Sequence, residues 1–242
     1  MPPPDPGPEA ARHDAAGAEI LRPHPTRDTF DAAMRQLKDE VVRMGSHVEE
    51  AIRAALDALA RRDAEAALGV IRADLRINEA QRRIAELVIR TIAMQQPVAR
   101  DLRYLLTLDH VAYELERMGD HAAGVAKQAR SLAPEPSLPR LDDLESIGAL
   151  VAQQVHDILR ALIDVDQAAA REVAARDDEI DHRHRRLLDD LMALMRADPG
   201  NVEPGAHVVF AAMALERVGD RVTNVAEDVV FLATGQVEDL NP

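Results

Sequence analysis

The chain has 242 residues, with 29 Lys or Arg against 43 Asp or Glu, so its formal net charge at pH 7 is −14. This sign argues against nucleic acid as a partner and favours cations or a basic protein surface. Without cysteine the chain can form neither disulfides nor thiolate metal sites. No apolar run approaches the ~20 residues that span a bilayer. The N-terminus also lacks the basic and apolar regions of a signal peptide, which predicts a cytoplasmic protein.

The composition favours helices over strands. Hydrophobic residues make up 47% of the chain, which is enough for a core, while aromatic residues account for only 2%. Ala, Leu, Arg, Asp and Glu dominate, and alternating runs of β-branched and aromatic residues are missing. We therefore predict an all-α fold.

The first half of the chain contains three predicted helices. Residues 1–26 are rich in Pro, Gly and Ala and are expected to form a flexible extension. Asp28 or Thr29 can cap the first helix, and Asp63 can cap the second. Pro97 is compatible with the first turn of the third helix. The predicted helices cover about 28–60, 63–96 and 97–132.

A second half with the same organisation follows a proline-rich linker at 134–139. Asp198-Pro199-Gly200 is expected to end its second helix, and Gly235 is suited to cap its third. These helices cover about 140–165, 167–197 and 204–234. The chain is thus predicted to be a tandem duplication of a three-helix bundle with six main helices, the bundles spanning 27–133 and 140–236 and a tail covering 237–242.

One helical motif occurs once in each half. Residues 115–120 read Leu-Glu-Arg-Met-Gly-Asp, and residues 215–220 read Leu-Glu-Arg-Val-Gly-Asp. Because its two carboxylates are four residues apart, each motif places them on one side of a helix, a single turn apart. Glycine inside a helix costs roughly 1 kcal/mol relative to alanine. It lies in the apolar stripe here, which indicates close approach of a neighbouring helix.

A second acidic motif precedes the first one in each half, in the helix before it. It comprises Asp74 and Asn78 in the first half and Asp177 and Asp181 in the second. If these helices pack together, each half gains one oxygen-rich site suited to Mg, Ca, Mn or Fe, and zinc is possible where His184 could add a nitrogen. The candidate metal ligands are Asp74, Asn78, Glu116 and Asp120 in the first half and Asp177, Asp181, Glu216 and Asp220 in the second.

An ordinary structural interpretation competes with metal binding. In so acidic a protein, carboxylate pairs at this spacing usually form solvated helix faces, and Arg117 and Arg217 could pair with them at the surface for about 0–1 kcal/mol each. The duplication of the motif with its glycine, together with the paired motif in the preceding helix, favours metal binding. No Ser/His/Asp or His-Glu-x-x-His arrangement is present, so an enzyme is not expected.

These features together resemble the PhoU family of bacterial phosphate-uptake regulators. The resemblance rests on the tandem bundles with Leu-Glu-Arg-hydrophobic-Gly-Asp, the two Asp-x-x-x-Asn/Asp motifs, and Gln-Pro-Val-Ala-Arg-Asp-Leu-Arg at 96–103. It covers about residues 28–236. The family implies multinuclear metal clusters on the acidic motifs, with Fe, Mn, Zn or Mg as the metal. When the metal ligands of the family are carried over to this sequence, they fall on the eight candidate residues given above.

The resemblance also implies a biological role. Family members negatively regulate the phosphate-starvation response and are thought to couple the phosphate ABC transporter, through its ATPase subunit, to a membrane sensor histidine kinase. They act at the cytoplasmic face of the membrane without crossing it, and a homodimer is possible. Two alternatives stay open: a carboxylate-bridged metal enzyme of the helical-bundle type, and a structural scaffold that binds no metal.

Overall fold

The structure is a computed structural model and describes residues 27–135, 138 and 141–240. The prediction of a flexible extension at 1–26 therefore lies outside the described residues. Within them the chain forms seven α-helices, one short 3₁₀ helix and no strand, which confirms the all-α prediction. The elements are α1 (Arg27–Arg61), α2 (Ala64–Gln95), α3 (Ala99–Leu132), α4 (Leu141–Asp164), α5 (Gln167–Ala174), α6 (Asp177–Ala197), η2 (Pro199–Asn201) and α7 (Val202–Thr234).

Side-chain caps begin corresponding helices in the two halves. The Asp63 carboxylate accepts hydrogen bonds from the backbone amides of Glu65 and Ala66 in the first turn of α2, at 3.0 and 2.9 Å, as predicted. Asp166 does the same for α5, with distances of 2.9 and 3.1 Å. Gly235 ends α7 in the left-handed region with φ 77°, which confirms its predicted role as a C-cap. The duplication therefore extends to the start of the second helix in each half, whereas α3 ends at Ala133 without such a glycine.

The predicted helix at 167–197 is not continuous, which corrects the sequence interpretation. It divides at Ala175 and Arg176 into α5 and α6. Three acidic residues, at 177–179, occupy the first turn of α6, where they interact favourably with the positive end of the helix dipole. The fifth main helix of the prediction is therefore present in two segments, and α6 starts with a buried Asp177.

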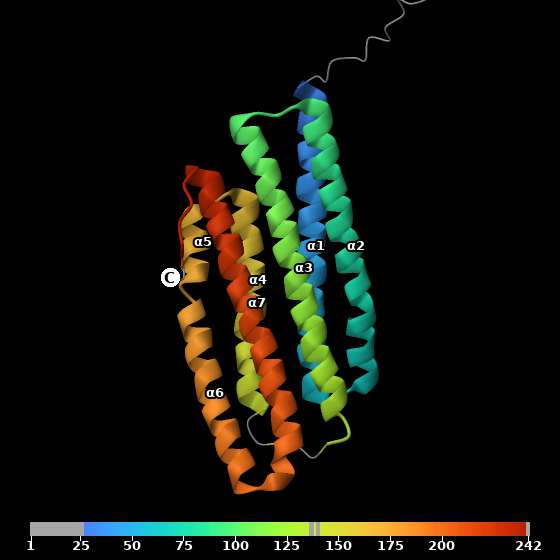
Figure 1. The fold of residues 1–242 in the computed structure, drawn as a ribbon, viewed down its shortest axis with the longest axis vertical. Coiled ribbons are helices and arrows are strands. Elements are labelled where there is room, and N and C mark those ends of the chain that lie inside the picture. The colour runs from blue at the N-terminus through green and yellow to red at the C-terminus, as the bar shows by residue number, and fades with distance from the viewer. Residues whose placement is uncertain (1–26, 136–137, 139–140, 241–242) are drawn as a thin grey trace, which may run out of the picture.

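The helices form two bundles that lie side by side (Figure 1). Helices α1, α2 and α3 pack together on one side, and α7 packs with α4, α5 and α6 on the other. α3 and α7 run antiparallel at the centre and form the main contact between the bundles, while α1 and α4 add a second contact. None of the described helices combines the length and the apolar content needed to cross a membrane.

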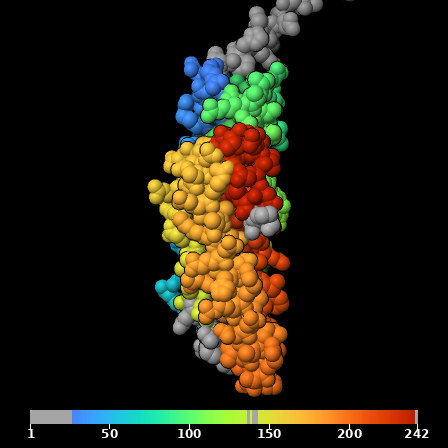
Figure 2. Space-filling view, turned by 90° about the vertical axis from the view of Figure 1, so that its left-hand side faces the viewer, coloured from blue at the N-terminus to red at the C-terminus, as the bar shows by residue number. Residues whose placement is uncertain are grey.

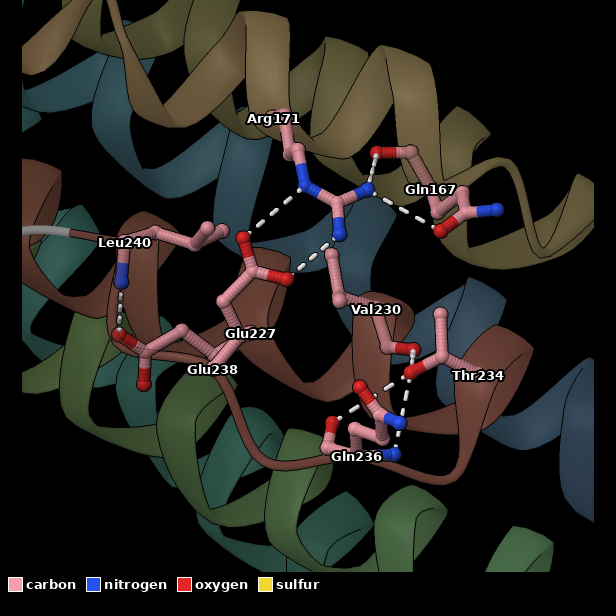
Figure 3. Close-up of polar contacts among 8 residues, drawn as sticks. All are labelled: Gln167, Arg171, Glu227, Val230, Thr234, Gln236, Glu238 and Leu240. Carbon is pink, nitrogen blue, oxygen red and sulfur yellow. Dashed lines mark hydrogen bonds and ion pairs between the residues drawn. The ribbon is translucent and has the colours of Figure 1, made fainter.

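The segment after α7 folds back and ties that helix to α5. Figure 2 shows α5, α6 and the C-terminal end of α7 together on one side of the molecule. Arg171 of α5 forms a two-pronged ion pair with Glu238, with nitrogen–oxygen distances of 3.2 and 2.6 Å (Figure 3). The Leu240 backbone amide donates to Glu227 at 3.0 Å. These contacts anchor residues 236–240 to the second bundle.

Candidate metal centre

The first acidic site lies between α2 and α3, which pack together. Asp74 and Asn78 are on α2, and Glu116 and Asp120 are on α3. Gly119 marks the close approach that the sequence predicts. A Cβ atom there would lie 2.9 Å from Ile77 Cδ1 and 3.3 Å from Asp74 Oδ1. The glycine thus brings the acidic turn of α2 against the acidic turn of α3.

Three carboxylates of this site lie near enough to repel one another. Burial raises the pKa of Asp74, and the nearby Asp120 carboxylate raises it further. Burial likewise raises the pKa of Glu116, followed by repulsion from Asp120. Oδ1 of Asp74, Oδ1 of Asn78 and Oε2 of Glu116 are buried and accept no hydrogen bond from any described residue. The site therefore holds oxygen atoms whose bonding capacity is unused.

Ordinary ion pairs are also present here, as the competing interpretation expects. Arg117 Nη1 lies 3.1 Å from Asp120 Oδ2, and Arg117 Nε lies 3.2 Å from Glu116 Oε2. The arginine side chain is 41% exposed, so these pairs are worth little in stability. They offset part of the negative charge of the first site and reach Oε2 of Glu116, whereas Oδ1 of Asp74 and Oδ1 of Asn78 have no donor among the described residues.

The second acidic site lies where α6 packs against α7. Asp177 and Asp181 come from α6, and Glu216 and Asp220 come from α7. Burial raises the pKa of Asp177 to about 6, with Asp181, Asp220 and Glu216 adding repulsion in that order. The pKa values of Glu216 and Asp220 are raised as well, first by burial and then by neighbouring carboxylates. The four predicted residues of the second half are therefore brought together.

Gly219 repeats the role of Gly119 and brings in a residue that sequence reasoning missed. A Cβ atom on Gly219 would lie 2.8 Å from Asp177 Oδ1 and 3.7 Å from Oε1 of Gln154. Gln154 is 1% exposed, and its Oε1 accepts no hydrogen bond within the described part of the chain. No sequence signal identifies this glutamine, because it lies on α4, outside both repeated motifs.

His184 distinguishes the second site further. It is buried, and its Nε2 has no hydrogen-bond partner among the described residues. Burial lowers the pKa of its imidazole, and the carboxylates of Asp181 and Asp220 act in the opposite direction. The ring therefore lies near the second site, and its burial favours the neutral form, which is the form that binds metals. Gln81 stands at the corresponding position of the first half.

The chemistry of both sites fits a cation, although the side chains are not arranged around one. No three Asp, Glu or His side chains of the described residues already lie close enough together to hold a metal ion. Carboxylate and amide oxygens are nevertheless the ligands that hard cations prefer, and several here are buried without a donor. Binding therefore requires these side chains to turn toward a shared centre.

Comparisons with known proteins show that the chain is a tandem repeat of one α-helical domain. A family model of the PhoU domain matches residues 41–129 and again residues 144–229. The PhoU homolog of Clostridium acetobutylicum, a phosphate-specific transport system accessory protein, is 37% identical over 89% of this chain and 99% of its own. The crystal structure of PhoU from Pseudomonas aeruginosa superimposes with a TM-score of 0.83 at 33% identity, covering 86% of this chain and 100% of that one. The chain belongs to the PhoU family.

Family membership and the tandem all-α fold that the sequence predicts are therefore confirmed. The domain boundaries predicted from the linker stay a prediction, as do the eight metal ligands and the identity of the metal. The structure brings each set of four to the contact between two helices. It places two further residues near the second set: His184, which the sequence already suggested as a nitrogen ligand, and Gln154, which the sequence did not indicate.

Proposed function

We propose that this protein regulates phosphate uptake through contacts with other proteins and is not an enzyme. The observation that carries this proposal is similarity over nearly the full length to proteins named as phosphate-specific transport system accessory proteins. One of them, from Streptococcus pneumoniae, is 33% identical, and the matched region covers 89% of this chain and 100% of the relative. A solved relative from that species is named a phosphate transport system regulatory protein. The proposed role is negative regulation of the phosphate-starvation response.

The partners in this proposal are the ATPase subunit of a phosphate ABC transporter and a sensor histidine kinase. Both contacts are expected at the cytoplasmic face of the membrane, with the protein bound peripherally and a homodimer as its assembled form. The net charge of −14 supports docking on basic protein surfaces, because complementary charge accelerates association and excludes wrong partners.

Metal binding at the two acidic sites is part of the same proposal, with Fe, Mn, Zn or Mg as the ion. Asp74, Asn78, Glu116 and Asp120 are the proposed ligands of the first site. A bound cation supplies positive charge that offsets repulsion among the carboxylates. The residues themselves link α2 to α3 in the first bundle and α6 to α7 in the second. The proposed ligands of the second site are Asp177, Asp181, Glu216 and Asp220.

A strain that lacks this protein tests the regulatory role. We expect phosphate-responsive genes to be expressed even when phosphate is abundant, and the wild-type gene to restore repression. A variant that loses the carboxylates of both repeated motifs should fold but repress less well, if metal binding serves regulation. Unaltered transcription and phosphate uptake in the deletion strain would contradict the proposal.

The alternative of a carboxylate-bridged metal enzyme has less support. Helical-bundle enzymes of that kind use Glu-x-x-His motifs that converge in one bundle core. The two acidic sites of this chain lie in separate bundles, and the relatives carry names of accessory or regulatory proteins. Turnover of oxygen or a reductant by metal-loaded protein is the measurement that would favour the enzyme.

A further inference from the structure

The turn between α2 and α3 exposes apolar side chains at one end of the molecule. Figure 1 shows this turn at the upper end of the first bundle, whereas the turn between α6 and α7 lies at the opposite end. Met94 is 64% exposed, Val98 is 75% exposed, and Ala99 beside it is exposed as well. We call residues 94–100 the apolar tip. Because its large apolar side chains lie mostly in solvent, they contribute little to the core.

Val98 occupies a position at which a polar residue is expected. It is the N-cap of α3, and its side chain makes no capping hydrogen bond. Ser, Thr, Asp and Asn are preferred at N-caps because their side chains accept hydrogen bonds from the first turn, as Asp63 does for α2. A valine at this position neither caps the helix nor fills the core. Residues that break a local rule without a gain in stability are expected at functional sites.

Two arginines flank the apolar side chains of the tip. Arg90 lies one turn before Met94 on α2, and Arg100 lies in the first turn of α3. Both are exposed, and neither forms a hydrogen bond or ion pair with any residue that the structure describes. No acidic residue lies between them in the sequence, and the adjacent Asp101 pairs with Arg27 at 3.0 Å. In a chain with 43 acidic and 29 basic residues, the segment 87–100 thus carries positive charge only.

Exposed apolar side chains beside free arginines match the surface of an anionic bilayer. Apolar side chains enter the boundary between headgroups and acyl chains, while basic side chains are attracted to the lipid phosphates. A protein partner fits this surface less well. A stable protein interface buries about 800 Å² on each partner, whereas the apolar tip is a single turn at the end of a bundle.

The acidic sites are too far from the tip to cancel this attraction. Glu116 lies about 25 Å beyond Ala99 along α3, at a rise of 1.5 Å per residue. That distance exceeds the Debye length of about 8 Å at physiological ionic strength. The negative charge of the body therefore opposes contact along the sides of the molecule but leaves the tip free to approach an anionic surface.

The turn between α6 and α7 provides a contrast within the same chain. Val202, at the start of α7, is 49% exposed. Asp198 and Glu203 flank it, so its surroundings carry the charge that anionic lipid repels. Apolar exposure without basic residues is thus present at the opposite end and serves as an internal control.

We propose that the apolar tip docks on an anionic phospholipid bilayer. Met94 and Val98 enter the headgroup region, and Arg90 and Arg100 contact lipid phosphates. The protein then stands end-on, with the turn between α6 and α7 directed away from the bilayer. This inference goes beyond the proposed function, which places the protein at the membrane through its two partner proteins.

Flotation of the purified full-length protein with lipid vesicles tests the apolar tip. We expect binding to vesicles of equal parts phosphatidylcholine and phosphatidylglycerol, little binding to phosphatidylcholine alone, and release at high salt. Val98→Ser should weaken binding about fivefold, because it removes apolar surface from the contact. Serine is a favoured N-cap, so this variant keeps α3 intact. Val202→Ser is the matched control and should bind as the wild type does.

The arginines are tested in the same assay. Arg90→Gln and Arg100→Gln should each lower the partition coefficient about fivefold, since each removes one basic residue from the anionic surface. Arg72→Gln removes the same charge from an exposed position about 27 Å away along α2. It should leave binding unchanged.

Insertion of the tip can be measured separately from attraction to the surface. The chain contains no tryptophan, so a single introduced tryptophan reports its own surroundings. The emission of Val98→Trp should shift to the blue when anionic vesicles are added, whereas that of Val202→Trp should not. Attraction by overall charge alone does not produce this difference.

Three results would overturn the inference. One is a folded wild-type protein that does not float with anionic vesicles. Another is binding that Val98→Ser and Arg100→Gln leave unchanged. The third is a blue shift of Val98→Trp that requires the transporter ATPase subunit and not lipid, which would assign the tip to a protein partner. The vesicle measurements involve no gene expression, so their failure is distinguishable from failure of the deletion-strain test.

Discussion

At the scale of single residues, the two motif glycines have a steric role. Gly119 and Gly219 stand where α3 and α7 meet the acidic turns of α2 and α6, and a Cβ atom at either position would approach a neighbouring side chain within 3.0 Å. The cost of glycine in a helix is accepted because a larger residue would separate the paired carboxylates. Gly124, five residues further along α3, has only ordinary contact distances.

Gly119→Ala and Gly124→Ala therefore should change stability in opposite directions. The added methyl at 119 meets Ile77 in the packed core, and we expect a loss of about 1–3 kcal/mol in the free energy of unfolding. At 124 the same change gains helix propensity, about 0.5–1 kcal/mol. Urea unfolding of both variants measures the difference. Equal stabilisation by both changes would show that the close approach at 119 has no energetic consequence.

At the scale of elements, polar pairs align α3 with α7. His110 Nδ1 donates to Asp228 Oδ2 at 2.7 Å, and His207 Nδ1 lies 2.8 Å from Gln128 Oε1 near the opposite end of the contact. The hydrogen bond to Asp228 is the largest cause of a raised pKa at His110, with Asp228, Glu114 and Asp109 adding favourable charge. The alignment of the two helices is thus linked to protonation of this histidine.

This linkage predicts a pH dependence of stability. Because the pKa of His110 is higher in the folded than in the unfolded state, its contribution is complete below about pH 6.5 and is lost as pH rises through the raised value. The ring is half exposed, so the effect is below about 1 kcal/mol. We expect the Tm of the wild type to fall between pH 6 and 8. The Tm of His110→Gln should fall less steeply over the same range.

The partly buried His156, which pairs with Glu49 between α1 and α4, provides the matched control. The Tm of His156→Gln should keep the dependence on pH that arises from His110. The opposite outcome is a Tm that depends on pH as in the wild type for His110→Gln but does not depend on pH for His156→Gln. This result would assign the pH dependence to the α1–α4 contact instead.

At the scale of the whole molecule, both repeated motifs lie on the two central helices. α3 provides Glu116 and Asp120 of the first site, and α7 provides Glu216 and Asp220 of the second. The two proposed cation sites therefore share the pair of helices that joins the bundles. A change in the ligand of one site is expected to reach the other through the contact between α3 and α7.

Elemental analysis of untagged protein tests the cation sites. Metal should be present in the wild type and absent from the variant that combines Glu116→Ala, Asp120→Ala, Glu216→Ala and Asp220→Ala. A chelator should lower the Tm of the wild type but not that of the variant, because a ligand stabilises only the state that binds it. The exposed carboxylates Glu86 and Glu203, replaced by alanine, serve as the control. Absence of metal after incubation with Fe, Mn and Zn would reject these sites.

The sequence by itself determined the helices, the duplication and the acidic motifs. These features depend on local periodicity: apolar residues every three to four positions, caps such as Asp63, and carboxylates one turn apart. The glycine in each motif even indicated which helix faces approach closely. This information is available because the geometry of one helix relates neighbouring residues directly.

Only the tertiary structure decided how distant helices meet. It divided the predicted helix at Ala175, placed Gln154 of α4 beside Asp177, and set the antiparallel register that pairs His110 with Asp228 and Gln128 with His207. No local periodicity contains these relations, because packing of whole helix faces selects the register between them. The acidic sites were thus predictable from within each repeat, whereas the seam between the repeats was not.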